Sequence, residues 1–130
     1  SSSGDNTRDL NTVVTNEITG ASLASNQITL PAGTYFVDAH APAFISNRHR
    51  GLIYNVTDSA ELLLGHNAYA REDDQVVTLG TVHGRFTLSA QKVIEFRHYV
   101  QRAQSTNGLG VSSADSRTAI YSQVFIRKVS

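Results

Sequence analysis

The sequence predicts an all-β fold, an antiparallel two-sheet jelly-roll sandwich with about eight strands. Val, Ile and Thr, which favour strands over helices, account for 31 of the 130 residues. Gly, Asn, Asp and Ser interrupt the apolar segments at intervals typical of β-proteins. No segment shows a convincing helical period. The best helix candidate, residues 59–69, contains only the short run Leu62–Leu64 before Gly65, and it predicts a strand equally well.

The first half of the chain is expected to contribute five strands. Residues 1–9 are polar and are interpreted as a linker or a cloning remnant, so the jelly-roll domain is expected to span residues 10–130. Residues 19–26 predict a loop of small residues, and Pro31–Gly33 predicts a turn. Pro42 is expected to end the third strand because proline has no backbone donor. The five strands are residues 10–18, 28–30, 34–41, 51–57 and 61–66.

Alternation within the strand at residues 34–41 predicts which side chains face the core. Tyr35, Val37, Ala39 and Ala41 share one face, which leaves the intervening side chains on the other face. In the strand at residues 51–57, the same rule groups Leu52, Tyr54 and Val56.

The second half of the chain predicts three longer strands. Residues 71–74 form a charged tract that is expected to be a solvated loop. The strands are expected at residues 75–89, bent at Gly80 or Gly84, at 92–101, and at 118–129 after a loop at 105–116. In the strand at 92–101, the residues on one face are Ile94, Phe96, His98 and Val100. The side chains expected to be buried between the sheets are Phe86, Leu88, Ile94, Phe96, Val124 and Ile126.

Composition excludes several classes of protein. Eleven basic and eleven acidic residues give a formal net charge of zero, which argues against nucleic-acid binding and against attachment to a membrane through basic residues. The absence of Cys excludes disulfides, thiolate metal sites and a cysteine nucleophile. No apolar run approaches the roughly 18 residues of a membrane helix, so no membrane insertion is expected. The absence of Met predicts a fragment or a processed product.

A search for catalytic and metal-binding motifs predicts that the protein is not an enzyme and carries no metal or cofactor. There is no glycine-rich phosphate loop and no nucleophile elbow, and the five histidines lack metal-ligand spacing, so they are expected at the surface or at an interface. Asp73 and Asp74 are acidic neighbours without the further ligands that a Ca²⁺ site needs. Glu95 and Asp38 are carboxylates of the type a glycosidase uses, but nothing in the sequence brings them together.

Arg48-His49-Arg50 is the densest local positive charge. It predicts a contact for an anionic sugar or a phosphate, although a solvated turn would have the same composition. The candidate receptor-binding residues are Arg48, His49, Arg50, Asp73 and Asp74. Nine of the eleven basic residues are Arg, which is favoured over Lys at desolvated subunit interfaces.

Short segments in a fixed order along residues 10–129 carry a family resemblance. The segments are Leu30–Tyr35, Asn47–Arg50, Leu52–Asn55, Gly84–Leu88, Arg97–Tyr99 and Tyr121–Lys128. In order and spacing they resemble the C-terminal β domain of bacteriophage tail fibres and tailspikes, and the layout is similar to the tumour-necrosis-factor and complement-head jelly roll. The lack of Cys and Trp, and the segment Ser89–Lys92 where animal members have a Gly-Asp turn, favour the phage proteins.

The resemblance implies a homotrimer on a phage virion that binds a bacterial surface glycan or protein and caps the fibre. Two alternatives stay open, a purely structural trimerisation module and a secreted cytokine-like or lectin-like module. In the last strand, Tyr121 and Phe125 are expected opposite a core face that begins at Ile120. Asp38 would need a partner at a buried interface, such as Arg85 or a histidine. The expected interface residues are Phe36, Asp38, His40, Thr81, His83, Arg85, Tyr121 and Phe125.

Overall fold

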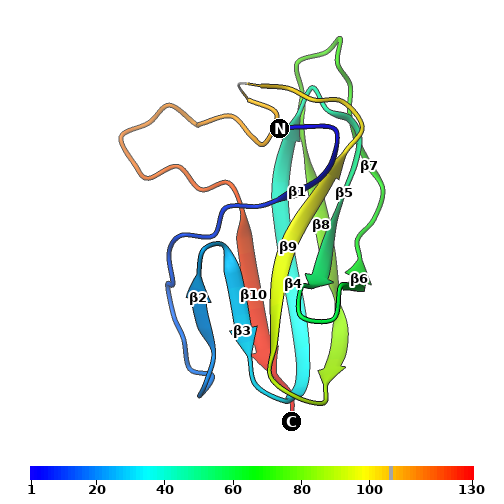
Figure 1. Ribbon diagram of the computed structural model, residues 1–130. Helices are drawn as coiled ribbons and strands as arrows, with labels where there is room; N and C mark the ends of the chain where they lie inside the picture. The colour runs from blue at the N-terminus through cyan, green and yellow to red at the C-terminus, as the bar shows by residue number, and fades with distance from the viewer. Residues whose placement is uncertain (106) are drawn as a thin grey trace.

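Two antiparallel sheets make up the protein in the computed structural model, which describes residues 1–105 and 107–130 (Figure 1). The described residues form no helix, which confirms the predicted all-β class. The strands are β1 (Gly4–Thr7), β2 (Ser22–Ala24), β3 (Gln27–Leu30), β4 (Gly33–Phe44), β5 (Asn47–Asn55), β6 (Ala60–Leu64), β7 (Ala68–Ala70), β8 (Val77–Leu88), β9 (Lys92–Val100) and β10 (Gln123–Lys128).

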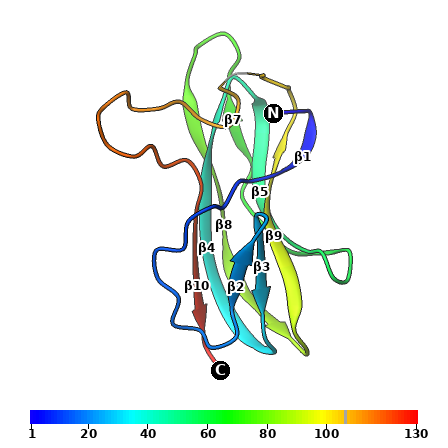
Figure 2. The ribbon, with the colours of Figure 1, turned by 60° about the vertical axis from the view of Figure 1, so that its left-hand side comes forward.

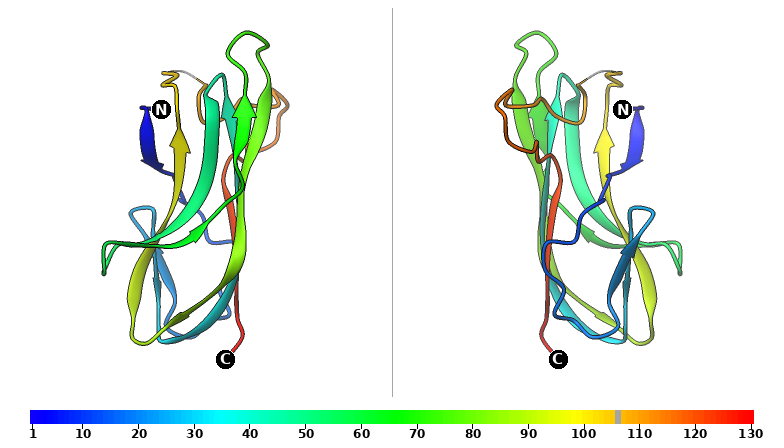
Figure 3. Two further views of the ribbon diagram at one scale, coloured as in Figure 1. Left: turned by 90° about the vertical axis from the view of Figure 1, so that its right-hand side faces the viewer. Right: turned by 90° about the vertical axis from the view of Figure 1, so that its left-hand side faces the viewer.

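The strands divide unequally between the sheets. The larger sheet has seven strands in the order β2-β3-β9-β5-β6, with β1 also paired to β9 and β7 to β5. The smaller sheet has the order β10-β4-β8, and β4 and β8 pair along twelve residues each. The two sheets lie as layers with their inner faces together (Figure 3).

The core lies between these layers. The predicted inner face of β4, which is Tyr35, Val37, Ala39 and Ala41, is fully buried. Of the six predicted core residues, Phe86, Leu88, Ile94 and Phe96 are buried, whereas Val124 and Ile126 are only partly buried. Their strand, β10, is at the edge of the smaller sheet, so the core covers them from one side only.

The N-terminal region differs from the prediction. Residues 4–7, expected to be a linker, form β1 and pair with β9. Residues 10–18, expected to form the first strand, lie outside the sheets, and Val14 is 93% exposed. Asn16 explains the difference, because its side chain accepts a hydrogen bond from the backbone of Ile18 and donates one to Ala21. Such local bonds compete with a strand ladder.

The segment at residues 19–26, expected to be a loop, contains half of a hairpin. Ala24 pairs with Gln27, so Ser25 and Asn26 form a two-residue turn between β2 and β3. Both turn residues have positive φ values, 52° and 63°, as the turn that best fits the twist of a hairpin requires. The pair Ser-Asn is a weaker sequence signal for this turn than Asn-Gly.

Strand β4 continues beyond Pro42, where the sequence predicted its end. Pro42 pairs with Leu79 of β8, but β10 begins opposite His40, so no strand of the described residues lies on the other side of Pro42. The missing backbone donor therefore costs no ladder bond.

Two further strands differ in their bounds and in the residues that face the core. Strand β5 begins at Asn47, and its buried Gly51 and Ile53 lie against Phe96 and the core. Leu52 and Tyr54, which the sequence grouped with Val56, share the other face of β5, and Val56 lies beyond the end of the strand. Strand β10 begins only at Gln123, and Ile120, expected on the core face, is 67% exposed.

A buried arginine closes one side of the sandwich. Arg8 follows β1 and is 2% exposed, and its guanidinium donates to Ser122 Oγ and Leu109 O, each at 2.8 Å. Burial lowers the pKa of Arg8 to about 10. Figure 2 shows the N-terminal segment running from β1 on the larger sheet toward the side of β10. Arg8 thus ties the larger sheet to the segment that leads into β10.

We predict that Arg8→Ala lowers the free energy of unfolding by about 2 kcal/mol, because it removes two charge-assisted hydrogen bonds and the packing of the aliphatic stem. Urea unfolding of the purified variant measures the loss. Arg71→Ala is the matched control, because Arg71 makes only exposed ion pairs with Asp73 and Asp74. The control should lose less than about 1 kcal/mol. An equal loss of unfolding free energy in the two variants would show that Arg8 does not have the proposed structural role.

Candidate functional site

The outer face of the smaller sheet brings together most of the residues predicted for an interface. The pairing of β4 with its neighbours places Asp38 opposite both His83 and Phe125, and Phe36 opposite Arg85. His40 pairs with Thr81 one step further along. Tyr121 is the exception, because it precedes β10. We call this surface the β4 outer face, defined by Phe36, Asp38, His40, Leu79, Thr81, His83, Arg85 and Phe125.

The β4 outer face exposes large apolar side chains. Phe125 is 63% exposed and Leu79 is 53% exposed, and Val77, the first residue of β8, is 45% exposed. Asp38 is also exposed, and it forms no ion pair among the described residues, so the expected pair with Arg85 is not present within one chain. These exposed apolar side chains make the face a candidate contact surface.

A second candidate surface lies on the outer side of the larger sheet. Arg48 pairs with Tyr69 of β7, and Arg50 pairs with Tyr99 of β9, so the four side chains share one face. Together with Asn67 they line a depression of about 520 Å³. We call it the arginine–tyrosine depression. Three of the predicted receptor-binding residues line it, Arg48, His49 and Arg50.

Three of the predicted receptor-binding residues offer no side chain to a ligand in the depression. His49 points between the sheets and is only 2% exposed, so it does not serve as a surface contact. The triplet lies within β5 and not in a turn, and alternation therefore turns its central residue inward. Asp73 and Asp74 are exposed and form ion pairs with Arg71, outside the residues that line the depression.

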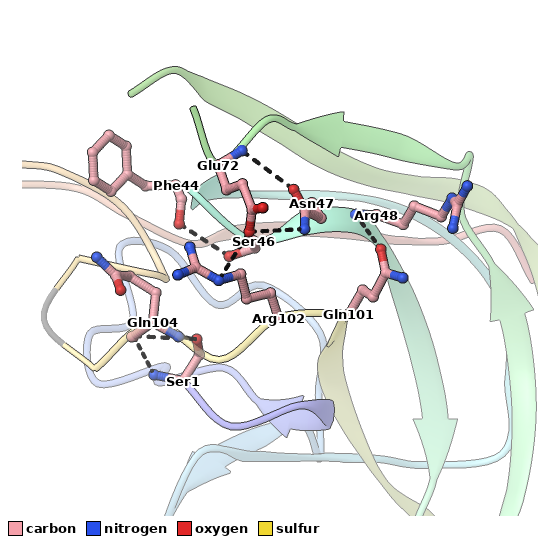
Figure 4. A network of polar contacts seen from close by, with 9 residues as sticks. All are labelled: Ser1, Phe44, Ser46, Asn47, Arg48, Glu72, Gln101, Arg102 and Gln104. Carbon is pink, nitrogen blue, oxygen red and sulfur yellow. Dashed lines mark hydrogen bonds and ion pairs between the residues drawn. The ribbon is translucent and has the colours of Figure 1, made fainter. Parts of the chain in front are cut away.

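A polar network holds the strand that carries Arg48. Asn47 exchanges hydrogen bonds with Glu72, and Glu72 pairs with Arg102 at 3.1 Å. Ser46 donates to Phe44 O at 3.1 Å and accepts from the backbone of Arg102. Figure 4 shows the side chain of Arg48 pointing away from this network. The backbone near the depression is therefore fixed while the guanidinium is left available.

Two buried histidines form a hydrogen-bonded pair that sequence analysis did not predict. His49 Nδ1 lies 2.8 Å from His98 Nε2, and His49 Nε2 lies 2.6 Å from Thr78 Oγ1. Thr78 donates its hydroxyl proton to Tyr69 O, so it accepts from His49 Nε2. His49 Nδ1 is then the acceptor for the Nε2 proton of His98. The geometry thus holds both rings in their neutral forms.

Space for this pair depends on a glycine. A Cβ at position 80 would lie 2.7 Å from His98 Nε2, so a larger residue at Gly80 would displace the ring. Burial lowers the pKa of His49 to about 4, and burial together with the charges of His49 and Arg8 lowers the pKa of His98 to about 3. The expectation that all five histidines lie at the surface or at an interface is therefore wrong for His49 and His98. The alternation grouped His98 with Ile94 and Phe96, but His49 was interpreted as a receptor contact.

The two carboxylates considered as a glycosidase pair lie on opposite sides of the sandwich. Asp38 is on the outer face of the smaller sheet, and Glu95 is on the outer face of the larger sheet, where its neighbours Ile94 and Phe96 turn into the core. Burial of the Glu95 carboxyl opposes ionisation, but hydrogen bonds from three side chains outweigh it and lower the pKa. The three donors are Gln27, Arg97 and Thr7.

Within residues 1–105 and 107–130, no three His, Asp or Glu side chains are grouped closely enough to hold a metal ion. The same residues contain no helix that could cross a membrane. A scan against protein-family models matches none of them, and a search among curated proteins finds no significant match.

We predict that the histidine pair makes folding acid-sensitive. Both rings stay neutral in the folded protein well below pH 6.5, whereas the unfolded chain takes up protons there. The free energy of unfolding therefore falls as the pH falls from about 6.5 toward 4, by on the order of 1 kcal/mol per pH unit for each histidine. Urea unfolding at a series of pH values measures this slope.

His98→Gln should flatten that slope, because one of the two titrating groups is lost. The matched control is His66→Gln, which replaces an exposed histidine and should keep the wild-type slope. Identical slopes in all three proteins would rule out the buried pair as the cause of acid sensitivity.

Proposed function

We propose that this chain is the trimeric head domain of a phage tail fibre or tailspike, and that it attaches the virion to a bacterial surface receptor and caps the fibre. The proposal combines the resemblance of segments along residues 10–129 with the exposed apolar surface of the β4 outer face. That surface is the observation that carries the proposal. A binding and assembly role fits it without any catalytic group.

The connections between the strands support a jelly roll. The chain changes sheets between β3 and β4, between β4 and β5, and again before and after β8, so neighbours in sequence are often not neighbours in a sheet. The smaller sheet joins β10 to β4 and β8, and the larger sheet joins β3 to β9 and β5. Repeated crossing between two sheets is what two interlocked Greek keys produce.

The occupant that we propose for the β4 outer face is the same face of two further copies of the chain. Phe125 and Leu79 would bury their side chains about a threefold axis, which removes these exposed apolar side chains from water. The face also carries both signs of charge, Asp38 beside His83 and Arg85 beside Phe36, so neighbouring copies can pair them. A closed ring of heterologous contacts satisfies such a surface.

The purely structural alternative makes the same trimer but needs no receptor contact. The arginine–tyrosine depression favours the receptor-binding form, because capping requires no such surface on the opposite side of the sandwich. A secreted cytokine-like or lectin-like module would share the trimer. Attachment of the labelled protein to bacterial cells, measured by fluorescence, separates these functions, and failure to bind any of a broad panel of bacteria would contradict attachment.

We predict a trimer, with a mass near three times the chain mass of 14.1 kDa in light scattering at micromolar concentration. Phe125→Glu should convert it to a monomer, since three carboxylates would be brought together in an apolar contact. Val14→Glu is the control, because Val14 is exposed in the N-terminal segment outside both sheets. A wild-type mass of one or two chains would exclude the trimer.

We predict that Asp38 of one chain pairs with Arg85 of a neighbouring chain. Asp38→Arg and Arg85→Asp should each weaken assembly, because like charges would then face one another. The double variant restores opposite charges and should recover the trimer, as analytical ultracentrifugation would show. No recovery in the double variant, with both single variants dissociated, would exclude this pair.

A further inference from the structure

We propose that the arginine–tyrosine depression binds the carboxylate of an acidic saccharide. The inference rests on the proposed attachment function and names the chemical class of the receptor. The ligand would place its carboxylate between Arg48 and Arg50 and lay a pyranose ring against Tyr69 or Tyr99. These residues come from β5, β7 and β9, so the site is built on paired strands and is present before a ligand arrives.

The charge of the depression is uncompensated. Five basic residues of the chain form ion pairs with carboxylates, namely Arg71, Lys92, Arg97, Arg102 and Arg117. Arg48 and Arg50 have no carboxylate partner among the described residues, and no acidic side chain lines the depression. In a chain with zero net charge, this places two arginines without a carboxylate partner on one small surface, which favours the binding of an anion.

The two arginines differ in how they are held. Arg50 donates from Nε and Nη2 to the carbonyl of Gly65, at 3.2 and 2.8 Å, so its guanidinium has a fixed position with Nη1 still free. The guanidinium of Arg48 makes no hydrogen bond to the described part of the chain and points outward (Figure 4). Arg48 can offer an adjustable fork for the bidentate recognition of a carboxylate, and Arg50 adds a fixed donor at Nη1.

The tyrosines distinguish a saccharide from a simple oxyanion. Tyr69 is 52% exposed and Tyr99 is 39% exposed, and both lie beside an arginine on the same sheet face. Flat aromatic rings offer apolar contact area, which a sugar ring can use and an isolated phosphate cannot. Asn67 adds an amide that can bond a hydroxyl. Asp5 lies beside Tyr99 on the side away from Arg50, which confines the anion to the arginine side.

The depression is compatible with the proposed assembly. It lies on the outer face of the larger sheet, whereas the β4 outer face belongs to the smaller sheet on the opposite side of the sandwich. Three copies that associate through the β4 outer face therefore leave three depressions open. Repeated weak binding at three sites raises the avidity for a polymeric surface.

Nuclear magnetic resonance titration of the ¹⁵N-labelled full chain tests the proposal. The probes are 3′-sialyllactose with lactose as its neutral counterpart, and trigalacturonate with its methyl ester. We expect at least one acidic probe to shift the amides of β5, β7 and β9 around the depression. Its neutral counterpart should bind at least tenfold more weakly. No shift at the depression by either acidic probe at 10 mM would overturn the proposal.

Variants assign the binding to named groups. Arg48→Gln removes a guanidinium that makes no hydrogen bond or ion pair within the described chain, and it should weaken binding of the acidic probe at least tenfold. Arg71→Gln, at an exposed arginine outside the depression, is the matched control and should bind as the wild type does. Tyr69→Ser should weaken the binding of the acidic probe and of its neutral counterpart by the same factor. Equal binding by the Arg48→Gln variant and the wild type would exclude the arginine role.

Two further measurements separate this proposal from its alternatives. If inorganic phosphate occupies the site at lower concentration than both acidic saccharides, the site is a general oxyanion site and the saccharide assignment is wrong. If a trimer with the Arg48→Gln substitution attaches to bacteria at the wild-type level, the depression is not the receptor site, but the attachment function stands. If the wild-type chain is a monomer and still binds the acidic probe, the trimeric head domain is refuted and the saccharide site stands.

Discussion

The twelve-residue pairing of β4 with β8 is the constraint on which the rest of the molecule depends. Because side chains alternate along a strand, one register decides both faces of the smaller sheet at once. It sends Tyr35 and Val37 into the core and leaves Asp38 and His83 side by side on the outside. A shift of one residue would exchange the core with the proposed interface.

The larger sheet shows how the interior can be partly polar without loss of order. His49 and His98 occupy positions where apolar residues would ordinarily stand, but each bond between them, Thr78 and the backbone has a defined donor and acceptor. Such a network is stable only while both rings are neutral, because a charge in the same place would be desolvated. The interior thus couples the fold to acidity.

The two faces of the sandwich differ in chemistry, and this difference organises the proposed function. The β4 outer face carries Asp38 and His40 along its central strand and exposed apolar side chains, Phe125 and Leu79, on the two flanking strands, a mixture that can serve a contact between copies of one chain. The arginine–tyrosine depression is cationic and aromatic, as a contact with an anionic sugar requires. The proposed assembly and the proposed recognition therefore use opposite surfaces and do not compete.

The sequence alone determined the all-β class, the inner face of β4 and, although it included Tyr121 and missed Leu79, most members of the β4 outer face, because a period of two is a local property of a strand. It failed at residues 10–18, where Asn16 bonds to nearby backbone, and at Pro42, which is harmless only because β10 stops short of it. It also could not pair His49 with His98 or place Arg48 beside Tyr69. These contacts join residues far apart in the chain, so only the pairing of β5 with β9 and β7 in the tertiary structure decided them.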